Sequence, residues 1–300
     1  LKEEVVQIIQ ICKRLLFYLG ITSIIHIFFT ERLIANEYGN YLSWGYARES
    51  GDNENLKSFF DGLNFSKLNT ELLEEALFES VLFSEWEKAR DLSSLIKKVN
   101  NKNSSANLLI LVDNFLNKKE VSKNIENIDL RFFDINFLKS IIIWTNQNDD
   151  FKFSDSENCV PIICLHSGMK LMTKGKKNEA IKYFDELLEQ NIQSTRIKEI
   201  LFLAYVNVKN FSTSAEIFGK LSLKDLNNKS YEMNYFEKNN YLLNPVKTNR
   251  EGLAETFYNI SSWYYQKNLF KYSVFFGKLS LRLRPNFNAM KLLLINALEN

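Results

Sequence analysis

The 300-residue sequence has few of the residues that form tight turns, with 10 glycines and 3 prolines. Together they make up about 4% of the chain, whereas they make up about 12% of an average protein. Sheet sandwiches and nucleotide-binding α/β folds need these residues at their turns and phosphate loops. The shortage therefore predicts an all-α fold.

Residues that build catalytic and metal sites are also scarce. The 3 cysteines are too few for a disulfide framework, and the 2 histidines leave little material for a metal site or a catalytic triad. A net charge of +2 gives no electrostatic footprint for nucleic acid. We therefore expect no enzyme activity, no cofactor, no metal and no nucleic-acid partner.

An apolar stretch near the amino end predicts export or membrane attachment. Residues 15–29 contain no Asp, Glu, Lys or Arg and follow the basic pair Lys13 and Arg14. As a helix this stretch would be about 22 Å long, which is shorter than the roughly 30 Å hydrocarbon core of a membrane. We expect residues 1–35 to form a signal peptide or an anchor-like helix, and the protein to be periplasmic or anchored in the inner membrane. The alternatives are a buried first helix and a cytoplasmic protein.

The rest of the chain shows a repeating helical pattern. From about residue 37, apolar residues recur at intervals of three and four, and candidate units begin near positions 37, 70, 104 and 137, which are 33 or 34 residues apart. The segments 161–194 and 254–287 also place small residues where two helices would cross and large residues beside them, as close helix packing requires. These residues are Cys164, Ser167, Gly168, Leu171, Ala180 and Phe184, and then Phe257, Ile260, Ser261, Tyr264, Ser273 and Ser280.

This pattern resembles the tetratricopeptide repeat (TPR) family, and the layout is similar to bacterial exported proteins with degenerate TPR arrays. The resemblance implies an α-solenoid, in which antiparallel helix pairs form a right-handed superhelix with a concave groove for peptides or proteins. It implies no catalysis. Gly277 and Leu187 depart from the family pattern, because an aromatic and a small residue are usual at their positions.

The same pattern suggests how the chain is divided. After the segment 1–35, we expect a degenerate TPR array over 36–226 and an insertion or linker over 227–250, which is rich in Asn and Lys. The part 251–300 would hold one TPR unit and the first helix of a further, truncated repeat that continues beyond residue 300.

The resemblance also implies which side chains face the groove. The groove would be partly aromatic and partly apolar, because tyrosine gives a large contact area and methionine adapts to varied partners. The alternative is that each of these residues packs against a neighbouring repeat. The candidates are Glu255, Tyr258, Ser262, Tyr265 and Gln266 in one unit, and Ile162, Leu165, Met169, Met172 and Thr173 in the other.

Cys159, Cys164 and His166 lie close together in the sequence, within a region interpreted as helix. Three residues at this spacing do not make a zinc site, which commonly needs four ligands. A disulfide is also not expected, because five helical residues rise about 7.5 Å, more than a disulfide bridges. We interpret His166 as a structural residue.

Two further clusters are interpreted as solvent-exposed segments. The run 174–177 (KGKK) lacks the Ser or Thr of a phosphate loop and lies between two helices. The acidic residues of the polar segment 146–158 have no histidine beside them to form an acid–base pair. They are Asp149, Asp150, Asp155 and Glu157.

Taken together, these features predict a non-catalytic scaffold that binds a protein or peptide in a concave groove. One alternative is an assembly or accessory factor of the cell envelope, anchored through residues 15–29. Another is the helical extension of an enzyme whose catalytic domain lies beyond residue 300.

Overall fold

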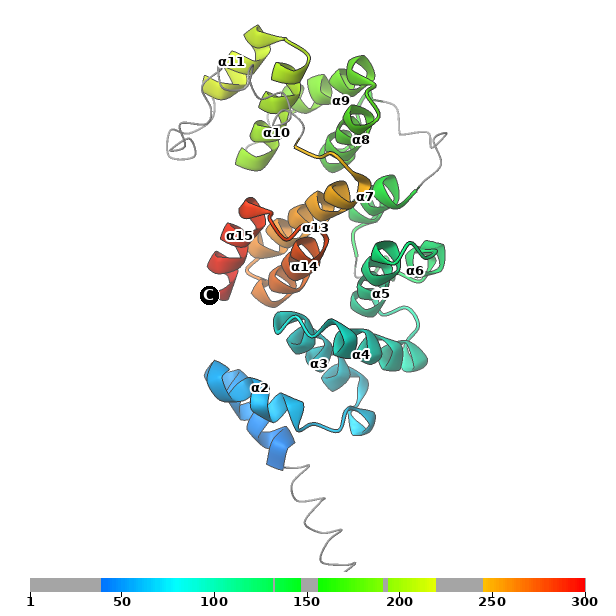
Figure 1. Ribbon diagram of the computed structural model, residues 1–300, viewed down its shortest axis with the longest axis vertical. Coiled ribbons are helices and arrows are strands. Elements are labelled where there is room, and N and C mark those ends of the chain that lie inside the picture. The colour runs from blue at the N-terminus through cyan, green and yellow to red at the C-terminus, as the bar shows by residue number, and fades with distance from the viewer. Residues whose placement is uncertain (1–38, 132, 147–155, 191–193, 220–244, 300) are drawn as a thin grey trace, which may run out of the picture. The chain divides into compact units, whose positions relative to one another are not determined.

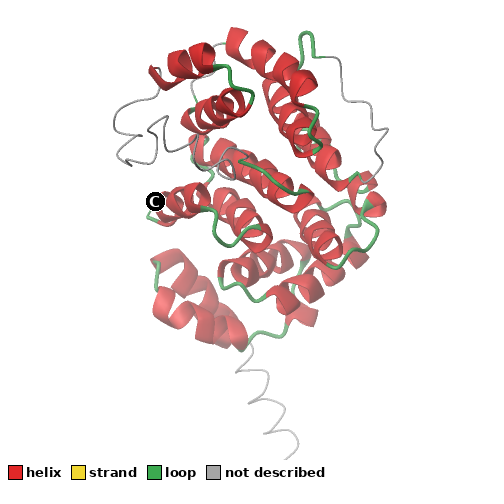
Figure 2. Cartoon of the chain, turned by 45° about the horizontal axis from the view of Figure 1, so that its top comes forward, coloured by secondary structure: helices red, strands yellow, loops and turns green. Residues whose placement is uncertain are grey.

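The computed structural model describes residues 39–131, 133–146, 156–190, 194–219 and 245–299. These residues form helices and connecting loops and contain no strand (Figure 2). The all-α prediction is therefore confirmed for the described part of the chain. The chain divides into two units, Leu1–Asn69 and Thr70–Asn300.

The predicted signal or anchor segment, 1–35, lies outside the described residues, as does most of the predicted linker 227–250. Among the helices that are described, none combines the length and the apolar character needed to cross a bilayer.

The first unit contains a helix over residues 39–50, helix α2 (Asn53–Asp61) and a short 3-10 helix (Phe65–Lys67). Gly51 adopts a left-handed conformation with a φ of 71°, which reverses the chain between the two longer helices. Trp44 and Phe60 are fully buried and form the core of this hairpin. This helix pair lies in the first of the predicted units, which begins near position 37.

The second unit contains most of the helices (Figure 1). In chain order they are α3 (Thr70–Leu82), α4 (Trp86–Val99), α5 (Ser104–Leu116), α6 (Ser122–Glu126), α7 (Ile135–Thr145), α8 (Pro161–Thr173), α9 (Lys177–Glu189), α10 (Thr195–Asn207), α11 (Phe211–Gly219), α13 (Asn249–Gln266), α14 (Phe270–Leu283) and α15 (Asn288–Leu298).

One type of turn recurs between consecutive helices. A residue with positive φ ends the first helix, and the next N–H donates to the carbonyl five residues before it, at 2.8 to 3.0 Å. This is the hydrogen bond of a Schellman cap. The intervals between the first three turns are 33 and 34 residues, and the interval between the fourth and fifth turns is 34 residues. These intervals match the predicted repeat. The turn residues are Gly51, Ser84, Lys118, Gly175, Lys209 and Asn268.

Small residues bring the helices of two pairs, α8–α9 and α13–α14, close together, as predicted. A Cβ atom on Gly168 would lie 2.5 Å from Cε1 of Phe184, so only glycine fits between α8 and α9 at this point. In the last pair, Ser261 Oγ donates to the carbonyl of Ser273 at 2.7 Å, and Ser280 Oγ donates to that of Ala254 at 2.8 Å. These contacts are consistent with a helical repeat.

The pair α13–α14 also packs against helices far away in the sequence. Helix α13 contacts α7 and α8, and α14 contacts α3 and α5, so the pair lies beside the earlier helices (Figure 1). Arg196 of α10 adds an ion pair to Glu255 of α13. In an open array each repeat contacts only its neighbours. The second unit therefore has additional long-range contacts that the repeat pattern does not predict.

Candidate functional site

The predicted groove residues of α13 differ in their exposure. Glu255 is completely buried, whereas Tyr258, Ser262 and Tyr265 are half-buried and Gln266 is exposed. We call the last four residues the α13 stripe. Most of the remaining α13 side chains between Gly252 and Ser261 are buried, so the helix is packed over this length, while Trp263 near its end is exposed.

The predicted groove residues of α8 are mostly inside the protein. Leu165, Met169 and Met172 are buried, and Ile162 and Thr173 are half-buried. The two methionines line a small apolar cavity of about 10 Å³ together with residues that follow the undescribed segment 220–244. Among these, Val246 is only 2% exposed. Here the chain's own residues cover the side of α8 that the resemblance assigns to the groove.

Glu255 is the centre of a buried charge cluster. Its carboxylate accepts a hydrogen bond from Nε of Arg196 at 3.3 Å and a second, shorter one from Nη2, while Arg284 Nη1 lies 3.4 Å away. Arg196 also pairs with Glu199 at 3.0 Å. Burial alone would lower the pKa of Arg196, but the carboxylates of Glu255 and Glu199 raise it above its usual value. Arg196 therefore stays positively charged, and its ion pair with Glu255 fixes α10 against α13.

The charge cluster continues to the edge of the α13 stripe. Both guanidinium groups lie over the ring of Phe287, with Cζ of Arg196 at 5.3 Å and Cζ of Arg284 at 4.9 Å from its centroid. The ring of Tyr258 packs on the same phenylalanine at 5.3 Å. Burial raises the pKa of Tyr258, so its hydroxyl is neutral at physiological pH. The cluster therefore positions Tyr258 through the ring of Phe287.

His166 lies in a buried polar network, in agreement with its interpretation as a structural residue. Trp144 Nε1 donates to Nδ1 of His166 at 2.8 Å, and Asn259 Nδ2 lies 3.2 Å from Nε2. Burial lowers the pKa of His166 from 6.5 to about 3. The imidazole is therefore neutral at physiological pH and joins α7, α8 and α13.

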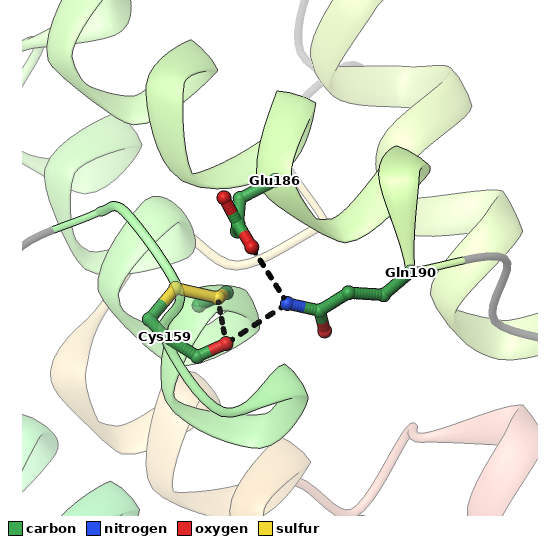
Figure 3. Close-up of a disulfide and its surroundings, with 4 residues drawn as sticks. Cys159, Glu186 and Gln190 are labelled. Atoms are coloured by element: carbon green, nitrogen blue, oxygen red, sulfur yellow. Dashed lines mark hydrogen bonds between the residues drawn. A yellow bond between two sulfur atoms is a disulfide. The ribbon is translucent and has the colours of Figure 1, made fainter.

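The cysteine prediction was wrong. Cys159 and Cys164 form a disulfide with their Cα atoms 5.7 Å apart, and Gln190 Nε2 donates to the carbonyl of Cys159 at 3.0 Å (Figure 3). The error came from treating Cys159 as helical. Helix α8 begins only at Pro161, so the chain before it is free to bring the two residues within the range that a disulfide spans.

Of the other two sequence clusters, the first is described in full and the second only in part. The run 174–177 lies in the turn between α8 and α9, where Gly175 has a φ of 75°. Glu157 is exposed, and Asp149, Asp150 and Asp155 lie outside the described residues. Within the described ranges, no group of three or more potential metal-ligating side chains is present.

The structure also contains a cleft that the sequence did not reveal. It has a volume of about 1020 Å³ and lies between α5, α6, the end of α7 and the start of α13. Its lining residues come from three separate stretches of the chain, 115–125, 142–146 and 249–250, so no local motif could identify it. They include Phe115, Leu116, Val121, Ile125 and Ile142, together with Lys118, Lys119, Glu120 and Arg250.

Comparison with protein-family models, with curated proteins and with solved structures found no match.

Proposed function

We propose that the protein is a non-catalytic scaffold of the TPR-like, α-solenoid type that binds a protein or peptide partner. The observation that carries this proposal is the α13 stripe, because Tyr258, Ser262, Tyr265 and Gln266 keep accessible surface on a helix whose other side chains between Gly252 and Ser261 are mostly buried. The regular spacing of the hairpin turns supports the assignment to a helical repeat.

Preorganisation is the proposed mechanism. Helix α13 is fixed by α14 on one side and by α7 and α8 on another, so the stripe loses little conformational entropy when a partner binds. Tyrosine side chains offer a large contact area with only two rotatable angles, which further lowers the entropic cost. In this proposal the buried Glu255 positions the stripe. Of the α8 candidates, Ile162 and Thr173 are half-buried and the other three are buried.

Site-specific photo-crosslinking in the native host tests this proposal. A benzoylphenylalanine side chain at Tyr265 should form adducts with a defined partner protein, whereas the same side chain at Tyr46 should not. Tyr46 is a suitable control because it is a 74% exposed tyrosine in the first unit. Replacing Tyr258 by alanine should then weaken the crosslink at position 265. Identical adducts from both positions, or none from Tyr265, would count against the stripe.

The disulfide favours a role in the cell envelope as the second candidate. Disulfides persist in oxidising compartments such as the periplasm and are rare in the cytosol. The Cys159–Cys164 bond thus supports the exported form of the proposal, in which residues 15–29 direct export or anchor the scaffold.

Thiol labelling of cells quenched in acid tests the compartment. Cys159 and Cys164 should react with a maleimide only after reduction and unfolding. Labelling of both cysteines without a reductant would contradict export and would favour the alternative of a cytoplasmic scaffold.

A further inference from the structure

We propose that the cleft between α5, α6, α7 and α13 binds an acidic amphipathic peptide segment of a partner protein. This proposal shares with the proposed function only the class of ligand. It concerns a different surface from the α13 stripe, so either site can fail in experiment while the other stands.

The cleft exists because the second helix of one pair is short. Helix α6 has 5 residues, whereas α4 has 14 and α9 has 13, so α6 covers only part of α5 and α7. The side chains left beside the gap form an apolar floor. They are all only half-buried, and they are Phe115, Leu116, Val121, Ile125 and Ile142.

The size of the cleft suits a ligand larger than an ion. Its volume of about 1020 Å³ is at the upper end of the roughly 300 to 1,000 Å³ range typical of ligand pockets. An open cleft of this size with an aliphatic floor accommodates several side chains of a peptide. Burial of apolar side chains on this floor would supply the attraction.

The rim of the cleft is positively charged. Among the described residues that line it, Lys118, Lys119 and Arg250 are basic and Glu120 is the one acidic residue. Lys118 and Lys119 are exposed and form no ion pair within the described ranges of the chain. The charge of the rim is thus available to a ligand, and an anionic group beside an apolar floor is attracted more strongly than one in bulk water.

The guanidinium of Arg250, at the rim of the cleft, is held in place by hydrogen bonds. Its Nε donates to the carbonyl of Leu283 at 2.6 Å and its Nη2 to that of Arg282 at 3.3 Å. No carboxylate neutralises the guanidinium in these contacts. A ligand carboxylate would meet this ordered positive charge together with the two lysines of the α5–α6 turn.

The floor favours a peptide over a single-stranded nucleic acid. Proteins that bind single strands stack successive bases on several aromatic side chains. Among the lining residues that the structure describes, Phe115 is the one aromatic residue. The combination of a largely aliphatic floor and a basic rim therefore fits alternating Leu and Glu side chains better than stacked bases.

Fluorescence anisotropy with the full chain tests the proposal. The probe is a labelled peptide that alternates Glu and Leu, and the comparison peptides replace every Glu by Lys or every Leu by Ser. The Glu–Leu peptide should bind about tenfold or more tightly than either comparison peptide, and added salt should weaken its binding. Equal affinity for the three peptides would overturn the proposal, as would tighter binding of an oligonucleotide with the same number of charges.

Matched variants locate the binding site. Lys118→Glu should weaken binding of the Glu–Leu peptide about fivefold, whereas Lys209→Glu should leave it unchanged. The two lysines are closely comparable, because both are exposed and end a helix with a positive φ, 55° and 61°. An equal loss from both variants would show that only net charge matters and would overturn the proposal.

A second pair of variants tests the apolar floor. Ile125→Asp should weaken binding of the Glu–Leu peptide about tenfold, whereas Val99→Asp at the exposed end of α4 should leave it unchanged. Circular dichroism and the thermal midpoint of each variant show whether it is folded. If Ile125→Asp fails to fold, Ile125→Ser provides the same comparison, and unchanged binding in a folded variant would overturn the proposal.

Discussion

Trp144 donates its indole N–H to Nδ1 of His166 at 2.8 Å, deep in the second unit. The two residues lie on α7 and α8, and Thr256 and Asn259 of α13 approach the same imidazole at 3.5 and 3.2 Å. Three helices therefore share one uncharged histidine. Since the site is fully buried, the imidazole contributes to stability only while it remains neutral.

This arrangement predicts that the protein loses stability in mild acid. Unfolded His166 would bind a proton near pH 6.5, but the folded protein lowers its pKa to about 3. Between these values the unfolded state holds one more proton, so the free energy of unfolding should fall by about 1.4 kcal/mol for each pH unit as the pH decreases. Above the unfolded pKa this contribution should be constant.

Thermal unfolding of the wild type and of His166→Gln at several pH values measures this effect. The variant should be less stable at neutral pH but should show a shallower loss in acid. Parallel curves for the two proteins would mean that His166 is not responsible for the acid sensitivity.

Gly252 provides a test of the packing between α7 and α13. A Cβ atom at this position would lie 2.2 Å from Cδ2 and from Cε3 of Trp144, both in a ring that is fully buried. Gly252→Ala should therefore lower the free energy of unfolding by about 1 to 3 kcal/mol. Gly45→Ala is the matched control, because no atom lies within 4 Å of its added Cβ and alanine favours a helix. Calorimetry should show that the control is neutral or stabilising.

The sequence predicts the helices better than their long-range packing. Small residues such as Gly168 and a recurring turn spacing are local features, so the helix pairs follow from the pattern alone. The contact between Gly252 and Trp144 joins residues more than a hundred positions apart, and no periodic signal relates them. For the same reason the sequence does not reveal that α13–α14 packs on α3, α5, α7 and α8.

The candidate site shows the same limit. The resemblance places both Glu255 and Tyr258 on the groove side of α13, but Glu255 is buried because Arg196 and Arg284 reach it from elsewhere in the chain. Spacing within one helix cannot show such partners. The disulfide was missed for a more local reason, since its prediction depended on where α8 begins, and Pro161 sets that point.

Glu255 should be among the most sensitive charged residues to substitution. Glu255→Gln removes the negative charge that faces Arg196 and Arg284 in a fully buried position. Breaking one side of a buried ion pair typically costs about 3 to 5 kcal/mol. Arg196 keeps Glu199 as a partner and Arg284 is partly exposed, so the loss should lie at the lower end of this range. Glu199→Gln removes a partner of the same Arg196 whose side chain is 21% exposed, so it should cost much less. Chemical denaturation of the two variants compares them, and equal losses would contradict the central role of Glu255.

The Cys159–Cys164 bond should stabilise the start of α8. The bond joins residues five positions apart, and closing so short a loop is expected to stabilise a protein by about 2 kcal/mol. A reductant should therefore lower the thermal midpoint of the wild type. The double variant Cys159→Ser, Cys164→Ser should unfold near the midpoint of the reduced wild type, and a reductant should not change it further. A reductant-dependent shift that persists in the double variant would have to arise from Cys12, the remaining cysteine, and would contradict this account.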